Sequence, residues 1–518
     1  MGRFIRLLLA GVLLLGSLAG AQIAGADPSD NPDDSHGETH GGPPEMAPFT
    51  GPAFSNMALV GNSDKDGTVN SDLAFWKDYA FSGNYNGFRI LDIGNPEQPR
   101  VLSDYFCRGP QNDVSVYKLR NRLLLFQSID TPQTQAECDG TQAGSSRDTT
   151  ISSGQRAFGF EGIRVFDVTD PTAPRFVTGV PTACGSHTHT TIEDKDDQRV
   201  LIYVSSYPLG SGITPAGGEA PAGLRCQSPH KKISIVEVPA RNPAAASVLR
   251  EEPLSSDTAP YPGAGGPLAP PFQACHDITA FMKQSIAVAA CAGDGQIWDI
   301  SNPENPTASD GESHTHIPDP NPTTGDRFEF VHNSVVTWDG QYFGLADETG
   351  GGGTAECDGS APEGTPPGAS SDGFYYFYKM VKPGAPAGGP LSRYMIPRPQ
   401  GTEICVSHNG NFIPTNKGYY LTAAYYQGGN TVVDVSDVTR PREIAYSDPS
   451  DAIGDADSWS TYWYNDHIYA NGGLDRRGPT RNRGFDVFRL FDGDGSVFRA
   501  RKFHHMNPQT QEVSQTVG

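Results

Sequence analysis

A short pattern recurs four times in this chain and constrains its fold more than any other feature. Each copy has an alternating apolar and polar run that ends in Asp, then a proline-containing turn, then a second run. Alternation of this kind is typical of β-strands, and proline cannot donate to a sheet ladder, so each copy predicts strand, turn, strand. The copies are GFRILDIGNPEQPRVLSDY (87–105), GIRVFDVTDPTAPRFVTGV (162–180), GQIWDISNPENPTASDG (295–311) and TVVDVSDVTRPREIAYSD (431–448).

Weaker copies at 232–251, 374–397 and 485–503 fill the gaps, and two further β-type runs precede every copy. The ends of the first strands of successive copies are 55 to 80 residues apart. Four-stranded sheets repeated at such a period close radially, which leaves only short, protected edges. We therefore predict an all-β fold, a seven-bladed β-propeller of four-stranded antiparallel blades over residues 54–506.

The strings RILDIGNPEQPR, RVFDVTDPTAPR and VVDVSDVTRPR resemble the LVIVD repeat of bacterial surface and secreted propellers. The resemblance covers most of residues 55–505, closely in four blades and loosely in three. It implies the propeller fold. It does not imply an activity, because propellers host many unrelated functions.

The two ends of the chain differ from the repeats. Residues 1–26 combine Arg3 and Arg6 with an apolar run and a small-residue site, which predicts a signal peptide cleaved after Ala26 and a secreted, extracellular protein. An uncleaved N-terminal anchor is the alternative. Residues 27–53 are rich in Pro, Gly and acidic residues and predict a disordered leader, and 507–518 predict a flexible tail.

The run MALVGN (57–62) resembles the fourth strand of a repeat without its first three. We expect it to pair with the last blade and fasten the ends of the ring together. Because Val497 to Phe503 is already a candidate fourth strand for that blade, the N-terminal run is expected as an additional edge strand.

The charge of the chain restricts its partners. The net charge is −22 at pH 7, and removal of residues 1–26 would leave 36 basic and 60 acidic residues. That balance argues against nucleic acid or an anionic membrane as partner. The apolar run from Leu7 to Leu18 is too short to span a bilayer, and no other run is long enough. We expect a monomer that binds an extracellular protein, a glycan or a small ligand.

The eight cysteines are even in number, and export favours disulfides. Four lie just before the first strand of a blade and four follow a second strand, so both kinds of position fall on one rim of the ring. Local pairing on that rim predicts Cys107–Cys138, Cys184–Cys226, Cys275–Cys291 and Cys357–Cys405.

Four histidines occupy equivalent positions at the starts of innermost strands, in blades three to six, and should share one height in the central channel. Several imidazoles round one axis suit a transition metal such as Fe, Cu or Zn. The alternative is structural, since a polar residue at the start of a strand can tie neighbouring blades together by hydrogen bonds. The four residues are His187, His276, His332 and His408.

Residues 62–72 resemble the front of a Ca²⁺ loop, with oxygen-bearing side chains on alternate positions round Gly67. The terminal bidentate Glu is missing because Leu73 stands there, and a plain acidic loop is the alternative. The candidate ligands are Asn62, Asp64, Asp66, Thr68 and Asn70.

Long Gly-, Pro- and Ser-rich insertions gather on the rim where the innermost strands begin, while the opposite rim has tight hairpins. Binding usually lies in long loops on a rigid scaffold. The sequence thus favours an extracellular binding scaffold that acts through this loop-rich face. The alternative is an enzyme, a metal-dependent oxidase or oxygenase with its site in the channel. The insertions lie at 130–160, 206–231, 252–274, 310–328 and 349–372.

Overall fold

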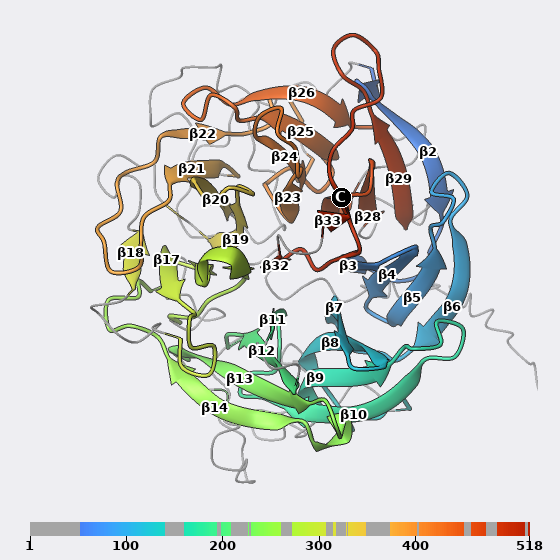
Figure 1. Cartoon of the computed structure of the whole chain (residues 1–518), viewed down its shortest axis with the longest axis vertical. Helices are drawn as coiled ribbons and strands as arrows, with labels where there is room; N and C mark the ends of the chain where they lie inside the picture. The colour runs from blue at the N-terminus through green and yellow to red at the C-terminus, as the bar shows by residue number, and fades with distance from the viewer. Residues whose placement is uncertain are drawn as a thin grey trace, which may run out of the picture.

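The computed structural model shows an all-β protein of seven sheets arranged radially round one axis (Figure 1). Each contains a four-stranded antiparallel blade, to which three of the sheets add a fifth strand, so the predicted seven-bladed β-propeller is confirmed. The structure describes residues 52–139, 160–193, 198–208, 226, 229–260, 272–306, 314–317, 328, 330–348, 373–400, 403–449, 457–472, 484–512 and 516–517.

The blades are numbered here in chain order, and the strands of each are given from the axis outward. Blade I has β3 (Asn70–Trp76), β4 (Tyr79–Asn84), β5 (Gly87–Asp92) and β6 (Arg100–Phe106). Blade II has β7 (Gln111–Leu119), β8 (Arg122–Gln133), β9 (Phe160–Asp167) and β10 (Arg175–Pro181). Blade III has β11 (Thr188–Glu193), β12 (Arg199–Ser205), β13 (Lys232–Pro239) and β14 (Ser247–Pro253). Blade IV has β15 (Ile278–Phe281), β16 (Ile286–Cys291), β17 (Asp294–Asp299) and β18 (Thr315–Ile317).

Blade V has β19 (Val331–Val336), β20 (Tyr342–Asp347), β21 (Tyr375–Lys379) and β22 (Ser392–Tyr394). Blade VI has β23 (Gly410–Phe412), β24 (Tyr420–Ala424), β25 (Asn430–Asp434) and β26 (Arg442–Ser447). Blade VII has β27 (Ser458–Tyr464), β28 (His467–Gly472), β29 (Phe485–Leu490) and β2 (Met57–Ser63). The only helices among the described residues are two 3₁₀ turns, η1 (Pro243–Ala245) and η2 (Met282–Gln284). No described helix is long and apolar enough to cross a membrane.

The repeated Asp and Arg of the sequence pattern have a common role at the end of the third strand. In blade I, Asp92 Oδ1 accepts from the Gly94 amide at 2.9 Å, and Arg100 donates to Asp92 Oδ2 at 2.8 Å. The Asp therefore caps the turn and also pairs with the Arg that begins the fourth strand. The same pairing recurs between Asp434 and Arg442 in blade VI, at 3.1 Å.

The ring closes through the N-terminal run. β2 pairs directly with β29 in antiparallel register, Leu59 opposite Phe488, and Figure 1 shows β2 (blue) beside β29 (red). The predicted pairing with the last blade is confirmed. The expectation of a fourth strand at Val497 to Phe503 is wrong, because β2 itself occupies that place, while β30 (Lys502–Phe503) pairs with β33 (Thr516–Val517). β1 (Phe54–Ser55) extends blade VI as a fifth strand beside β26.

The C-terminal segment runs across the channel at the ends of the inner strands (Figure 1). β31 (His505–Met506) pairs with β3 of blade I, and β32 (Thr510–Gln511) pairs in parallel with β15 of blade IV. Residues 506–512 are buried. We expected a flexible tail from residue 507; its described part, 507–512, is instead a plug between the blades.

Blade IV corrects one boundary. The sequence repeat of this blade was expected to span 295–311, but the fourth strand, β18, lies beyond that range and pairs with β17, His316 opposite Gln296. The range 310–328, expected as a loop between blades four and five, therefore contains a strand.

Candidate metal centre

The four channel histidines converge as the repeat alignment predicts. His187 and His276 stand just before β11 and β15, His332 lies in β19, and His408 precedes β23. Each is only 1% exposed. The ring centroids lie 4.5 Å apart for His187 and His276, 3.8 Å for His276 and His332, and 4.2 Å for His332 and His408. Residues more than 200 positions apart in sequence thus form one row of stacked and tilted imidazoles.

Hydrogen-bonding groups of the protein contact both nitrogens of His187. Nδ1 lies 2.8 Å from the buried Asp130 carboxylate, so it carries the proton and donates. Nε2 is therefore the acceptor, and the Tyr207 hydroxyl and the Gln111 amide each approach it at 3.0 Å. Hydrogen bonds thus occupy both nitrogens of His187, which leaves three histidines of the predicted four with a geometry suited to an ion.

A carboxylate that the sequence analysis missed completes the cluster. Glu348 follows β20 and is fully buried. Its Oε2 lies 3.4 Å from His332 Nε2, and its Oε1 lies 3.5 Å from His408 Nε2. Tyr426 donates its hydroxyl to Oε1. His332, His408 and Glu348 each offer a ligand atom within 4.8 Å of the others, which is a spacing that one ion can bridge.

His332 also belongs to a second group of ligand atoms, with His276 and Asp277. Asp277 Oδ1 lies 3.4 Å from His276 Nδ1, and Asp277 Oδ2 accepts from Asn333 at 2.9 Å. Because Asn333 belongs to the next blade, Asp277 also ties two neighbouring blades together by a hydrogen bond, which is the structural role considered in the sequence analysis. The same holds for Thr188, whose hydroxyl donates to the His276 carbonyl oxygen at 2.7 Å.

Burial and the neighbouring rings set the charge of the cluster. Burial, together with His276, His408 and His187, holds the pKa of His332 well below its usual value, so this imidazole is neutral at neutral pH. Nδ1 of His332 has no hydrogen-bond partner among the described residues. A buried polar atom without a partner costs about 1–3 kcal/mol. The other nitrogen of this ring, Nε2, is the one that faces Glu348.

The position of Glu348 had a recognisable sequence signal. In two blades an acidic residue comes directly after the second-strand residue that pairs with the first residue of the innermost strand. Ile129 pairs with Gln111 and is followed by Asp130, and Asp347 pairs with Val331 and is followed by Glu348. Antiparallel pairing places such a residue beside the start of the innermost strand. An acidic residue just before a long insertion was therefore the sign that the sequence analysis did not use.

Disulfides lie close in sequence to the starts of the innermost strands. The predicted pairs Cys107–Cys138, Cys184–Cys226 and Cys275–Cys291 are present. Cys405 is also disulfide-bonded, and its expected partner Cys357 lies outside the described residues. Disulfides are compatible with the predicted secretion. The predicted signal peptide and the predicted leader at 27–53 lie outside the described residues.

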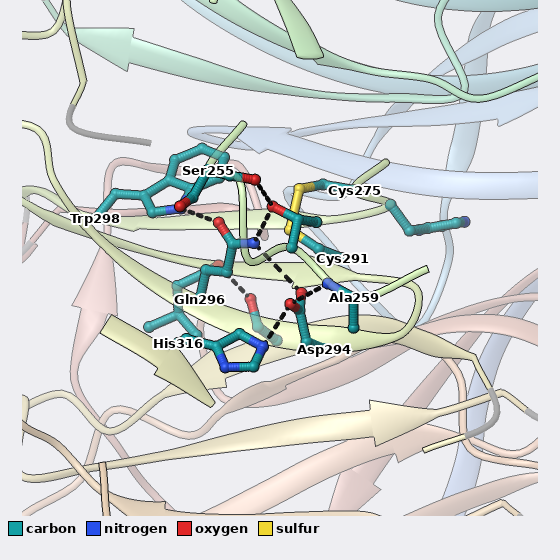
Figure 2. Close-up of a disulfide and its surroundings, with 12 residues drawn as sticks. Ser255, Ala259, Cys275, Cys291, Asp294, Gln296, Trp298 and His316 are labelled. Atoms are coloured by element: carbon teal, nitrogen blue, oxygen red, sulfur yellow. Dashed lines mark hydrogen bonds and ion pairs between the residues drawn. A yellow bond between two sulfur atoms is a disulfide. The ribbon is translucent and has the colours of Figure 1, made fainter. Parts of the chain in front are cut away.

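Figure 2 shows the Cys275–Cys291 disulfide, which lies directly before His276, beside a polar cluster on β17. The buried Asp294 accepts from the Ala259 amide at 2.7 Å, and His316 Nε2 lies 2.7 Å from its carboxylate. These contacts attach the segment after blade III and the outer strand β18 to the middle of blade IV.

The predicted calcium ligands differ from one another in burial and in hydrogen bonding. Asn62 donates to Asp486 at 2.7 Å, and Asp64 and Asp66 are exposed, whereas Thr68 and Asn70 are buried. The guanidinium of Arg89 donates to the backbone oxygens of Ser63 and Asp64 at 3.1 and 2.9 Å. A protein cation thus already contacts the carbonyl oxygens of this loop. Calcium binding here stays a prediction.

The fold and this cluster define the class of the protein: a β-propeller with a buried group of histidines and carboxylates in its channel. The family model for the LVIVD repeat matches residues 69–106, so the chain carries an LVIVD repeat, as the resemblance indicated. No curated protein matches the chain. A crystal structure of a candidate 6-phosphogluconolactonase from Bacteroides fragilis is similar at 9% identity and a TM-score of 0.47, covering 86% of this chain and 98% of that one.

Proposed function

We propose that the protein binds one transition-metal ion in its channel, with His276, His332, His408 and Glu348 as ligands, and acts as a metal-dependent oxidase or oxygenase. The observation that carries the proposal is the buried group of His332, His408 and Glu348, whose ligand atoms lie within 4.8 Å of one another. The centroid of the His276 ring lies 3.8 Å from that of His332. Imidazole and carboxylate ligands together suit Fe, Cu and Zn.

The surroundings favour binding over a purely structural role. Neighbouring imidazoles stacked at about 4 Å gain little from one another when all are neutral and repel when protonated. Tyr426 holds Oε1 of Glu348, and the Trp459 carbonyl oxygen accepts from Nδ1 of His408. Such second contacts orient ligands in metal sites and select the ring nitrogen that faces the ion.

The second candidate is the extracellular binding scaffold. It is favoured by the position of the long insertions, which leave the strands at the rim where the histidines begin the inner strands. In this case the cluster would set the shape of the channel mouth, and a protein, glycan or small ligand would contact the loops.

Metal analysis of the purified chain separates the two. We expect about one Fe, Cu or Zn per chain in the wild type, and loss of that metal in His332→Ala and in the near-isosteric Glu348→Gln. His504→Ala, at an exposed histidine outside the channel, is the matched control and should retain the metal. Circular dichroism and thermal unfolding of each variant show whether the blades are intact.

A wild-type chain that binds none of the three metals, even after incubation with each, would refute the metal centre. If the two variants were then as stable as the His504 control, the scaffold would be the better account. If they lost stability without any metal in the wild type, the cluster would be structural.

A further inference from the structure

His332 belongs to two sets of ligand atoms that have the same composition. One set adds His408 and Glu348, which the proposed function uses, and the other adds His276 and Asp277. The centroid of the His332 ring lies 4.2 Å from that of His408 and 3.8 Å from that of His276. Each set thus combines an imidazole and a carboxylate of its own with the shared His332, and in each the ligand atoms lie within 4.8 Å of one another.

Asp277 is the buried carboxylate that a single ion at Glu348 leaves unexplained. Its side chain is 0% exposed, and Oδ2 accepts from the Asn333 amide at 2.9 Å. Oδ1 accepts no hydrogen bond from the described residues and lies 3.4 Å from His276 Nδ1, which is longer than an ordinary N–H···O hydrogen bond. The hydrogen bond between blades therefore accounts for only one of the two carboxylate oxygens.

The distances from carboxylate to imidazole fit ligands round an ion in both sets. Two ligand atoms that each lie about 2.1 Å from a tetrahedral Zn²⁺ are about 3.4 Å from each other. Asp277 Oδ1 and His276 Nδ1 are 3.4 Å apart. The oxygens of Glu348 lie 3.4 Å from His332 Nε2 and 3.5 Å from His408 Nε2. The second set therefore repeats the spacing of the first.

We propose that the channel binds a second transition-metal ion, with His276, Asp277 and His332 as ligands. This second site rests on the proposed function, because it adjoins the ion at His332, His408 and Glu348. His276 serves the second ion when both ions are bound. Ions in two-metal centres lie about 3.5–4 Å apart, which neighbouring sets with a common residue allow. Because like charges so close repel, the second ion binds more weakly than the first and enters when metal is added.

Metal titration of the full chain tests the second site. The chain is stripped with a chelator, and zinc bound per chain is measured by equilibrium dialysis against rising ZnCl₂. We expect one ion at low zinc and about two at saturation in the wild type. Asp277→Asn, which keeps an oxygen that can accept from Asn333, should bind only one. Asp130→Asn is the matched control and should bind two, because this buried carboxylate contacts His187 and belongs to neither set.

Copper gives an independent readout of the same site. With two Cu²⁺ ions added per chain, spin coupling between neighbouring ions should reduce the ordinary Cu²⁺ EPR signal of the wild type. Asp277→Asn should instead show the uncoupled signal of a single bound ion. The wild-type spectrum decides the matter if Asp277→Asn fails to fold.

The possible failures are distinguishable. A wild type that saturates at one ion would overturn the second site; if that ion is lost in Glu348→Gln and kept in Asp277→Asn, the proposed function stands. A wild type that binds no metal at any concentration would overturn both. Two ions that persist in Asp277→Asn would place the second ion elsewhere and would also overturn the proposal.

Discussion

Asn507→Ala probes the plug at its most connected side chain. Asn507 Oδ1 accepts from the Val116 amide at 2.8 Å, and Nδ2 donates to the Val116 carbonyl oxygen at 2.8 Å and to the Thr191 hydroxyl at 3.2 Å. Truncation leaves the buried N–H and C=O of Val116 without partners, at about 1–3 kcal/mol each. A cavity of about 10 Å³ beside Asn507, about the room one water needs, allows partial rescue. We expect a loss of about 2–4 kcal/mol.

For a domain this long, that loss corresponds to a fall in Tm of about 2–5 °C. The assay is differential scanning calorimetry at a fixed scan rate, together with amide hydrogen exchange of residues 505–512. Asn95→Ala, on the exposed turn of blade I, is the matched control. Asn507→Asp keeps the acceptor and sets a carboxylate oxygen against the Val116 carbonyl oxygen, so it should cost at least as much. Equal Tm and equal exchange in the Asn507 and Asn95 variants would refute the docking of the plug.

Two further predictions concern blade IV. The hydrogen bond that His316 donates to the Asp294 carboxylate raises the pKa of His316, and burial raises the pKa of Asp294. Stability from the pair is therefore full below pH about 6.5 and is lost as pH rises through the folded pKa of His316. Thermal unfolding from pH 5 to 8.5 should show His316→Gln losing more against the wild type at the acid end, and a flat difference would contradict this. Removing the Cys275–Cys291 disulfide with paired Ser substitutions should cost roughly 3 kcal/mol for a loop of this size. It should also weaken retention of a metal at His276, as chelator competition would show; unchanged retention would mean that the disulfide does not position the ligand.

The blade architecture was predictable because its determinants are local. A strand that ends in Asp, a proline turn and an Arg eight residues after the Asp identify the third and fourth strands, and Asp92 and Arg100 show why the pattern exists. The position of β18 was not predictable in the same way. The segment after Asp299 has the Asp–Pro turn but no β-branched run. The strand forms further along the chain, where His316 contacts Asp294.

The plug could not be predicted from local pattern. Residues 507–512, NPQTQE, have no apolar alternation and few groups to bury, which is the composition of a flexible tail. They dock through side-chain amides instead: Asn507 bonds to β7, Gln509 to Asp72, and Gln511 donates to the Val336 carbonyl oxygen at 2.8 Å. The acceptors are channel-facing groups of three blades, which come together only after the ring has closed.

The histidine cluster was half predictable. Repeat alignment places equivalent residues at one height, so the meeting of the four rings followed from the fold. Which of them could bind an ion depended on partners from other segments. His187 is held by Asp130 and Tyr207, 57 and 20 residues away, whereas His332 and His408 meet Glu348. Alignment of inner strands alone gives no information on the second strands that supply these partners.

Whether the buried polar groups of the channel stabilise the fold can be judged from which of them have hydrogen-bond partners. Some buried polar ties between blades, such as the hydrogen bond from the Thr188 hydroxyl to the His276 carbonyl oxygen, pair both atoms within the protein. His332 Nδ1, Asp113 Oδ1 and Gln509 Oε1 are not satisfied in this way among the described residues. Each buried orphan lowers the free energy of unfolding, and an apolar side chain of similar size would avoid that cost. A channel built only to hold the ring together would therefore not need these groups.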